Sequence, residues 1–158
     1  MPKPSLVVVV VEDDRHRMLV YRYLRKRGLS PHQIRTKPSP SGRGSAEQWV
    51  RTMFAAEVKE YRIRLAKAAT ADATALIVMI DADTHTLQER LAQLSKTLRE
   101  CGMHAIGDRE RIVQLVPKRN VETWILCLNG HPVDEARDYR GKRDDWNEMI
   151  PSAAEALF

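Results

Sequence analysis

The sequence has few of the residues and segments that mark specialised classes of protein. It contains only two cysteines, Cys101 and Cys127, too few for a disulfide framework or a cysteine-based zinc site. Both lie in apolar, apparently helical surroundings, so we expect them to be buried thiols. No run of 18 or more apolar residues occurs, so no membrane-spanning helix and no membrane partner are expected.

The beginning of the chain also lacks the features of a secretory signal. The apolar run from Leu6 to Val11 is short and ends on Glu12 instead of on the small residues of a cleavage site. We therefore expect a cytoplasmic protein. The length suits one hydrophobic core, so residues 1–130 are expected to form one domain. Residues 131–158 are expected to form a charged tail that either packs as one helix near its end or stays loose.

Acidic residues are absent between Asp14 and Glu47, although basic residues are frequent there. The chain has a net charge of +5 and an isoelectric point near 9.4, which is compatible with a polyanionic partner. This basic stretch is either a surface that faces phosphate or a solvated helix face. The candidate nucleic-acid-binding residues are Arg15, Arg22, Arg25, Lys26 and Arg43.

Apolar runs and helical patterns alternate along the chain. Leu6 to Val11 and Ala75 to Ile80 are continuous and rich in β-branched residues, as in strands buried on both faces of a parallel sheet. Shorter strands are expected over residues 33–36 and 111–117. Helices are expected over about residues 14–28, 46–69, 84–100 and 120–130, the third with a buried face made of Leu87, Leu91, Leu94 and Leu98. This order predicts an α/β fold with a mainly parallel four-stranded sheet sandwiched by helices.

Charged residues follow three of the expected strands. Ligands of parallel α/β sheets bind beyond the carboxyl ends of the strands, so these residues are candidates for a site. The first strand is followed by Glu12, Asp13 and Asp14, the third by Asp81 and Asp83, and the fourth by Lys118, Arg119 and Glu122. Carboxylate oxygens are the ligands that Mg²⁺ prefers. Lys118 and Arg119 at the same edge would stabilise charge on a phosphate. A shared metal requires the first and third strands to lie side by side.

Most of these acids also have a purely structural explanation, whereas Asp81 directly follows five apolar residues at the edge of the sheet, where a carboxylate needs a cation or several donors. Asp13 or Asp14 can cap the helix that follows the first strand, and Asp83 can cap the helix after the third. Glu122 suits the first turn of a helix, where the macrodipole favours an acid. The five histidines have no common spacing and are interpreted as ordinary surface or core residues.

The acids at the strand ends resemble those of the TOPRIM domain of topoisomerases, primases and the OLD (overcoming lysogenisation defect) nucleases. A Glu follows the first strand, an Asp-x-Asp motif follows a later strand, and "PKRNVETWI" is similar to the segment in which an acid opens a helix after the last core strand. The resemblance covers about residues 6–128 and implies a TOPRIM-like or Rossmann-like fold. The chain departs from the pattern at Asp13, where typical members have Gly, and at His16, where OLD-like nucleases have another acid.

This resemblance implies a divalent-metal-dependent phosphoryl-transfer protein, a nuclease that acts on DNA or RNA with Mg²⁺ or Mn²⁺. Glu12 would be the general acid or base and also a metal ligand. Asp81 and Asp83 would be metal ligands, and Glu122 a further one. Small stand-alone members resemble components of mobile-element and phage-defence operons beside an ATPase, so the resemblance implies an ATPase partner and leaves the oligomeric state open.

Two other interpretations stay open. The segment from Val7 to Leu29 also resembles the opening of a response-regulator receiver, a signalling module in which paired acids bind Mg²⁺ and an Asp after the third strand accepts phosphate. Asp81 would be that phosphoacceptor, although it lies further from Asp13 along the chain than receivers allow. The other interpretation is a non-catalytic TOPRIM-like module that binds a partner ATPase or nucleic acid.

Overall fold

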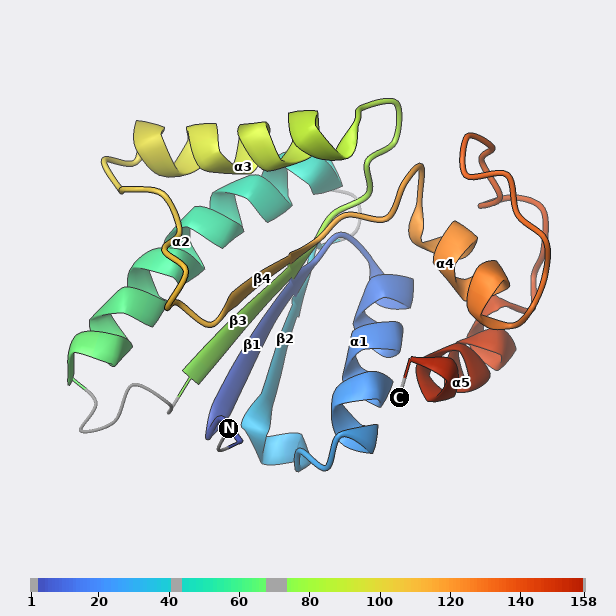
Figure 1. Ribbon diagram of the computed structural model, residues 1–158, viewed down its shortest axis with the longest axis horizontal. Coiled ribbons are helices and arrows are strands. Elements are labelled where there is room, and N and C mark those ends of the chain that lie inside the picture. The colour runs from blue at the N-terminus through green and yellow to red at the C-terminus, as the bar shows by residue number, and fades with distance from the viewer. Residues whose placement is uncertain (1–2, 41–43, 68–73, 158) are drawn as a thin grey trace.

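A computed structural model describes residues 3–40, 44–67 and 74–157. In these residues four strands form one all-parallel sheet in the order β2-β1-β3-β4, flanked by five α-helices (Figure 1). The strands are β1 (Leu6–Val11), β2 (Ile34–Pro38), β3 (Thr74–Met79) and β4 (Ile112–Leu115). The helices are α1 (Asp14–Lys26), α2 (Ala46–Lys67), α3 (Leu87–Glu100), α4 (Val121–Leu128) and α5 (Trp146–Ala156), with a short 3₁₀ helix η1 (Pro31–Gln33). The α/β fold expected from the sequence is confirmed, and it is consistent with a Rossmann-like or TOPRIM-like arrangement.

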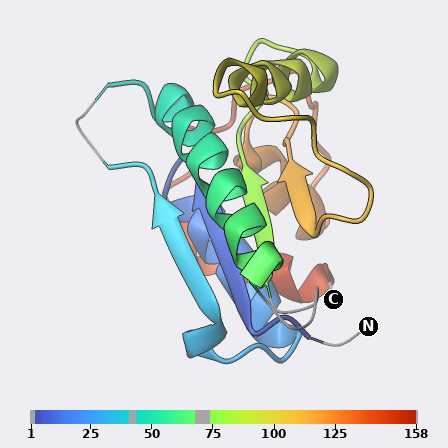
Figure 2. The same ribbon diagram turned by 90° about the vertical axis from the view of Figure 1, so that its left-hand side faces the viewer.

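The helices cover both faces of the sheet, with α1, α4 and α5 on one face and α2 and α3 on the other (Figures 1 and 2). The valines of β1 alternate between these two layers. Val7, Val9 and Val11 pack with the first group of helices, and Val8 and Val10 pack with the second. β1 is therefore buried on both faces, as its unbroken valine run predicts. None of the helices in the described ranges combines the length and apolar character that a membrane crossing requires.

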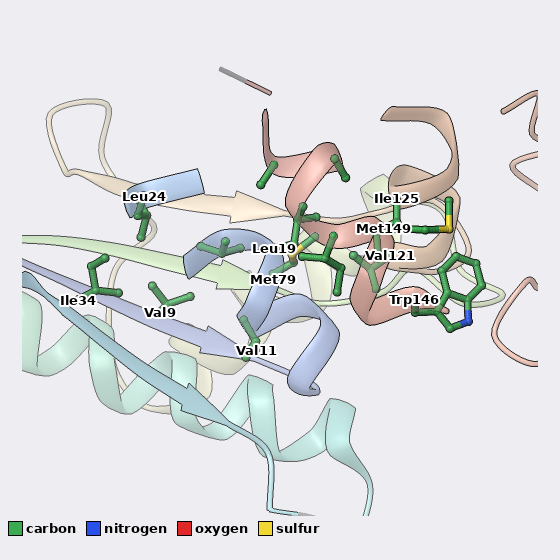
Figure 3. Close-up of a cluster of buried hydrophobic side chains, with 14 of the residues drawn as sticks. Val9, Val11, Leu19, Leu24, Ile34, Met79, Val121, Ile125, Trp146 and Met149 are labelled. Atoms are coloured by element: carbon green, nitrogen blue, oxygen red, sulfur yellow. The ribbon is translucent and has the colours of Figure 1, made fainter. Parts of the chain in front are cut away.

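The C-terminal helix α5 is part of the hydrophobic core. Trp146, Met149 and Ile150 are buried against α1 and α4, and Figure 3 shows Trp146 and Met149 near Val121 and Ile125 of α4. The sequence left open whether the tail packs as one helix near its end or stays loose. The structure shows a packed helix, α5. The irregular segment of residues 131–145 connects α4 to α5.

The path of the chain creates a crevice between β1 and β3. From β1 the chain passes through α1, on one face of the sheet, to β2, which lies at one side of β1. It then returns through α2, on the opposite face, to β3 at the other side of β1. β1 and β3 are paired in parallel from Leu6 and Thr74 to Val11 and Met79, which confirms that these strands are neighbours. Because their following segments lead to opposite faces of the sheet, the carboxyl ends of β1 and β3 form the switch point where open α/β sheets bind ligands.

Some expectations about individual residues are wrong. Cys101 and Cys127 are exposed, because Cys101 follows the last residue of α3 and Cys127 lies outside the buried set of α4. Leu87 is 47% exposed, and Arg90 takes a buried position on the same helix. The cap of α3 is Thr86, whose Oγ1 accepts the Glu89 N–H at 3.1 Å. Asp83 is thus not needed as a helix cap.

Candidate metal centre

Glu12, His16 and Asp81 converge at the carboxyl ends of β1 and β3, where α1 begins (Figure 1). Each offers one ligand atom, and these atoms lie within 4.8 Å of one another. The Asp81 backbone N–H donates to Glu12 Oε2 at 3.2 Å, so the main chain after β3 orients the side chain after β1. The sequence predicted that Glu12 and Asp81 would meet, and they do. The residue types and spacing of this group could hold a metal ion.

His16 is fully buried and lies between two acids. Its Nδ1 is 2.7 Å from Asp13 Oδ1, and its Nε2 is 2.9 Å from Asp81 Oδ1. Asp13 is also the cap of α1, because the same oxygen accepts the His16 backbone N–H at 3.0 Å. Asp13 therefore fixes the ring and leaves Nε2 facing Asp81, an arrangement that orients metal-binding histidines. His16 is buried, as a core histidine would be. Sequence reasoning did not include it in the candidate site, although its position four residues after Glu12 was an available signal.

The group concentrates negative charge inside the protein. Burial, with a further contribution from Asp81, raises the pKa of Glu12 to about 7, and burial also raises the pKa of Asp81. Burial opposes the charged form of His16, but hydrogen bonds with Asp13 and Asp81 outweigh it and raise the pKa of His16 to about 10. Burial would raise the pKa of Asp13, but its hydrogen bond with His16 outweighs this and lowers the pKa to about 2. A positive charge is therefore stabilised at this position.

A hollow of about 280 Å³ opens beside the group and will be called the acidic hollow. Its lining consists of Glu12, Asp13, Ser45, Ala46, Glu47, Asp81, Asp83 and Arg140. Asp83 has a φ of 53° and Arg119 a φ of 66°, left-handed conformations that are rare outside glycine. The Asp83 N–H donates to the Arg119 carbonyl at 2.8 Å, which joins these two strained positions. Backbone strain of this kind clusters at functional sites.

Two arginines that sequence reasoning missed hold the segment of Asp81 and Asp83. Arg90 is buried on α3, donates from Nε to the Asp81 carbonyl at 2.8 Å, and has Nη2 3.5 Å from Asp83 Oδ2. It also pairs with Glu47 of α2 at 2.6 Å. Arg140 donates to Asp83 Oδ1, and its Nη2 lies 3.6 Å from Asp81 Oδ2. Arg90 interrupts a leucine-rich helix face, a signal that could have been noticed, whereas Arg140 lies in a segment without periodicity.

Glu122 is not part of the Glu12, His16 and Asp81 group. It is 1% exposed, and its Oε1 pairs with Arg15 Nη1 at 2.5 Å. The Arg15 guanidinium lies over the ring of Trp146, 5.6 Å from its centre. Within the described residues, Glu122 Oε2 has no hydrogen-bond partner. Arg15 and Glu122 thus connect α1 with α4 and α5 instead of facing the acidic hollow.

Lys118 and Arg119 also face other residues. Lys118 Nζ lies 3.4 Å from Glu135, and Arg119 lies 3.9 Å from Asp138, both acids of the segment between α4 and α5. Neither basic residue lines the acidic hollow as the structure describes it. The lining of the hollow therefore does not support the expected role of these two residues in stabilising charge on a phosphate, although Arg119 Nη1 donates to the Asp83 carbonyl at 3.5 Å.

The other basic candidates line a groove of about 730 Å³ between α1 and α5, which will be called the basic groove. Its lining consists of Arg17, Met18, Tyr21, Arg22, Arg25, Lys26, Pro31, Pro151, Ala154 and Glu155. Lys26 pairs with Glu155 across it, and Arg22 and Arg25 are exposed. Arg43, the remaining candidate, lies outside the described residues. Four bases of the stretch, Arg17, Arg22, Arg25 and Lys26 of α1, thus lie along one hollowed surface.

No similarity to a known protein adds to this picture. Comparison of the chain with protein-family models, with curated proteins and with solved structures finds no match, so its function has to be inferred from the group of Glu12, His16 and Asp81 and from the hollow beside it.

Proposed function

We propose that this protein is a cytoplasmic, divalent-metal-dependent phosphoryl-transfer enzyme, a nuclease that acts on DNA or RNA. One observation carries the proposal: Glu12, His16 and Asp81 bring ligand atoms within 4.8 Å of one another at the crevice between β1 and β3. The acidic hollow beside the group supports it by giving a substrate access. The TOPRIM-like pattern of the sequence, an acid after β1 and two after β3, falls at this same edge of the sheet.

We assign the metal as Mg²⁺ or Mn²⁺, held by Glu12, His16 and Asp81, with Asp83 at the rim of the hollow. A bound divalent ion supplies Lewis-acid charge for a phosphate and lowers the pKa of a coordinated water. Asp13 fixes the ring of His16, and Arg90 fixes the main chain of Asp81, so the donor atoms are oriented by the fold itself.

Glu12 is the residue of the group best placed to exchange a proton with a substrate, because it lines the acidic hollow and is only partly buried, whereas His16 and Asp81 are buried. Its role as general acid or base is part of the same proposal. The basic groove is proposed as the surface that contacts the nucleic-acid backbone, through Arg22, Arg25 and Lys26. The sequence resemblance also suggests an ATPase partner. We propose that this protein needs such a partner if it binds metal but does not cleave nucleic acid by itself.

The receiver alternative has less support from the geometry. A phosphoacceptor needs a carboxylate that a phosphodonor can reach, but Asp81 is only 3% exposed. Its Oδ1 is bonded to His16, and its Oδ2 faces Arg140. Phosphorylation would have to break both contacts inside a crowded acidic site, whereas a metal ion would take the place of the proton between His16 Nε2 and Asp81 Oδ1.

Calorimetric titration with Mn²⁺ and with Mg²⁺ tests the proposal on the wild type, on Asp81→Ala and on Asp108→Ala. Asp108 is an exposed acid outside the hollow and serves as the matched control. We expect metal affinity to fall by more than about tenfold in Asp81→Ala only, since it loses a ligand. Cleavage of DNA and of RNA is then measured in the same proteins.

Three outcomes separate the alternatives. Equal metal affinity in the wild type and Asp81→Ala, or no metal binding, would contradict the metal centre. Metal binding with cleavage that Asp81→Ala abolishes would support the nuclease. Metal binding without cleavage of either nucleic acid would instead indicate a subunit that needs its partner.

A further inference from the structure

Arg140 enters the acidic hollow from a part of the chain that the sequence pattern does not connect with the site. Among the described residues that line the hollow, it is the only basic one. It comes from the irregular segment between α4 and α5, far along the chain from Asp81 and Asp83. Its guanidinium nevertheless bridges these two carboxylates, with a hydrogen bond to Asp83 and a 3.6 Å approach to Asp81.

The main chain of Arg140 is fixed on both sides by well-anchored groups. Its N–H donates to Asp138 Oδ1 at 3.0 Å, and its carbonyl accepts the indole N–H of Trp146 at 3.3 Å. Asp138 Oδ1 also accepts from Asn120 Nδ2 at 2.9 Å, and both Asn120 and Trp146 are buried. The main chain of Arg140 is therefore held in one position beside the hollow, although it belongs to an irregular segment.

The side chain of Arg140 is suited to bind an anion. The side chain is 46% exposed while Nη2 contacts the two acids, so it is open to solvent as well as paired. A guanidinium stays charged at any physiological pH and presents a planar fork of donors that matches two phosphate oxygens. Asp81 and Asp83 hold the fork at the position where a substrate phosphate would meet the metal centre.

We infer that Arg140 binds a phosphate group of the substrate in the acidic hollow, and that Asp81 and Asp83 position it there before the substrate arrives. The inference rests on the proposed function, because it takes the substrate to be a phosphate ester. It gives Arg140 the role that the sequence suggested for Lys118 and Arg119. An anion enters a hollow lined by acids only when added positive charge offsets them, so phosphate binding requires the metal as well as Arg140.

This role predicts opposite effects on two ligands. Arg140 occupies carboxylates that a cation would also use, so Arg140→Ala should leave Mn²⁺ affinity unchanged or increase it. The same substitution should lower the affinity of the Mn²⁺-loaded protein for phosphate. A residue that merely stabilised the fold would instead weaken the binding of both ligands.

The experiment titrates Mn²⁺ into the protein, and then inorganic phosphate into the Mn²⁺-loaded protein, by calorimetry. We expect Arg140→Ala to bind phosphate about tenfold more weakly, or weaker still, and Arg140→Lys to recover part of the loss because it keeps the charge without the fork. Arg143→Ala is the control, since Arg143 lies in the same segment but pairs with Asp145. Thermal unfolding of each variant confirms that it is folded.

Equal phosphate affinity in the wild type and Arg140→Ala would overturn the inference, as would no phosphate binding by the wild type or weaker binding of both ligands by the variant. Cleavage distinguishes this failure from that of the proposed function. Arg140-dependent phosphate binding without cleavage of DNA or RNA would sustain the inference and refute the nuclease. Cleavage with the same kcat and KM in the wild type and Arg140→Ala would do the reverse.

Discussion

His16 stands where the resemblance to OLD-like nucleases would place an acid, yet its ring faces the candidate metal position. Asp13 holds Nδ1, and Nε2 lies among oxygens of Glu12 and Asp81. Mg²⁺ prefers oxygen donors, whereas Mn²⁺ and later transition metals also accept imidazole. If the proposed metal centre forms, this single residue would favour Mn²⁺ over Mg²⁺.

Replacing His16 with Asp should reduce the preference for Mn²⁺ over Mg²⁺, because an oxygen donor replaces the nitrogen. The quantity to measure is the ratio of the two dissociation constants, obtained by calorimetry on the wild type and on His16→Asp. His32→Asp introduces the same side chain at an exposed position outside the group and should leave the ratio unchanged. An identical ratio in His16→Asp would show that the imidazole does not contact the metal.

The stability of the metal-free protein should depend on Asp81 more than on Asp83. Asp81→Asn leaves the buried, charged His16 with one carboxylate partner fewer, which should lower the free energy of unfolding by about 2 kcal/mol. Asp83→Asn affects a partly exposed side chain and should cost less than about 1 kcal/mol. Urea unfolding without metal measures both values. If repulsion between Glu12 and Asp81 dominated instead, Asp81→Asn would be at least as stable as the wild type.

Among the elements, α2 is joined to the loop before β4 by Arg62. Its guanidinium pairs with both oxygens of Glu110, at 2.7 and 2.9 Å, and donates to the carbonyls of His104 and Ala105 at 3.1 Å. The hydrogen bond with Arg62 lowers the pKa of Glu110. The loop between α3 and β4 is therefore held by one bidentate ion pair in addition to its apolar contacts.

Glu110→Gln should destabilise the protein in a pH-dependent way. The folded-state pKa of Glu110 lies below the unfolded value, so the pair contributes stability above that unfolded value and loses it as the pH falls through the folded value. We expect a cost of about 1 kcal/mol near pH 7 that begins to decrease below the unfolded Glu pKa of about 4.3 and disappears as the pH falls through the lowered folded pKa. Urea unfolding across this range tests it, with Glu100→Gln, in an exposed pair with Lys96, as the control. A cost independent of pH would exclude the ion pair as its cause.

The elements could be predicted from the sequence because their signals are local. The unbroken valine run of β1 predicts a strand buried on both faces. The acids after β1 and β3 meet because neighbouring parallel strands end at the same edge of the sheet. Gly28 and Gly102 end their helices with positive φ. The same local reasoning wrongly placed Leu87 on the buried face of α3. Helical periodicity shows which residues share a face, but it does not show how much of that face other elements cover.

The rest of the site depends on contacts between distant parts of the chain. The sequence around Arg90 does not show that its guanidinium donates to the Asp81 carbonyl. The sequence around Arg140 does not show that Trp146 and Asp138 hold its main chain. Burial of a charged group is favourable only when its partners are supplied by other elements. Those partners are a property of the tertiary structure and have no local pattern.

For the whole molecule, the important feature is the separation of charge between two surfaces. Acids gather at the carboxyl edge of β1 and β3, and bases line the groove between α1 and α5. α1 links the two, because His16 lies in its first turn and Arg25 in its last. A nucleic acid lying along the basic groove would thus approach the acidic hollow along the axis of one helix.

The double substitution Arg22→Gln and Arg25→Gln should weaken DNA binding and also make it less sensitive to salt. Each neutralised phosphate contributes about 0.9 to the slope of log affinity against log salt, so losing two contacts should reduce the slope by about 1.8. Fluorescence anisotropy at several salt concentrations gives the slope. Arg99→Gln with Arg109→Gln removes the same charge from exposed positions outside the groove. An equal effect in this control pair would mean that only net charge matters.

Because the Trp146 indole holds the main chain of Arg140, the order of synthesis determines when Arg140 can be positioned. Synthesis produces Glu12 and Asp81 well before Arg140, at about 5–20 residues per second, and the indole that holds the Arg140 carbonyl follows still later. A growing chain therefore contains the acids of the hollow for several seconds before Arg140 is made. Under the proposed function, a nascent chain would contain its metal ligands before it could hold a substrate phosphate through Arg140.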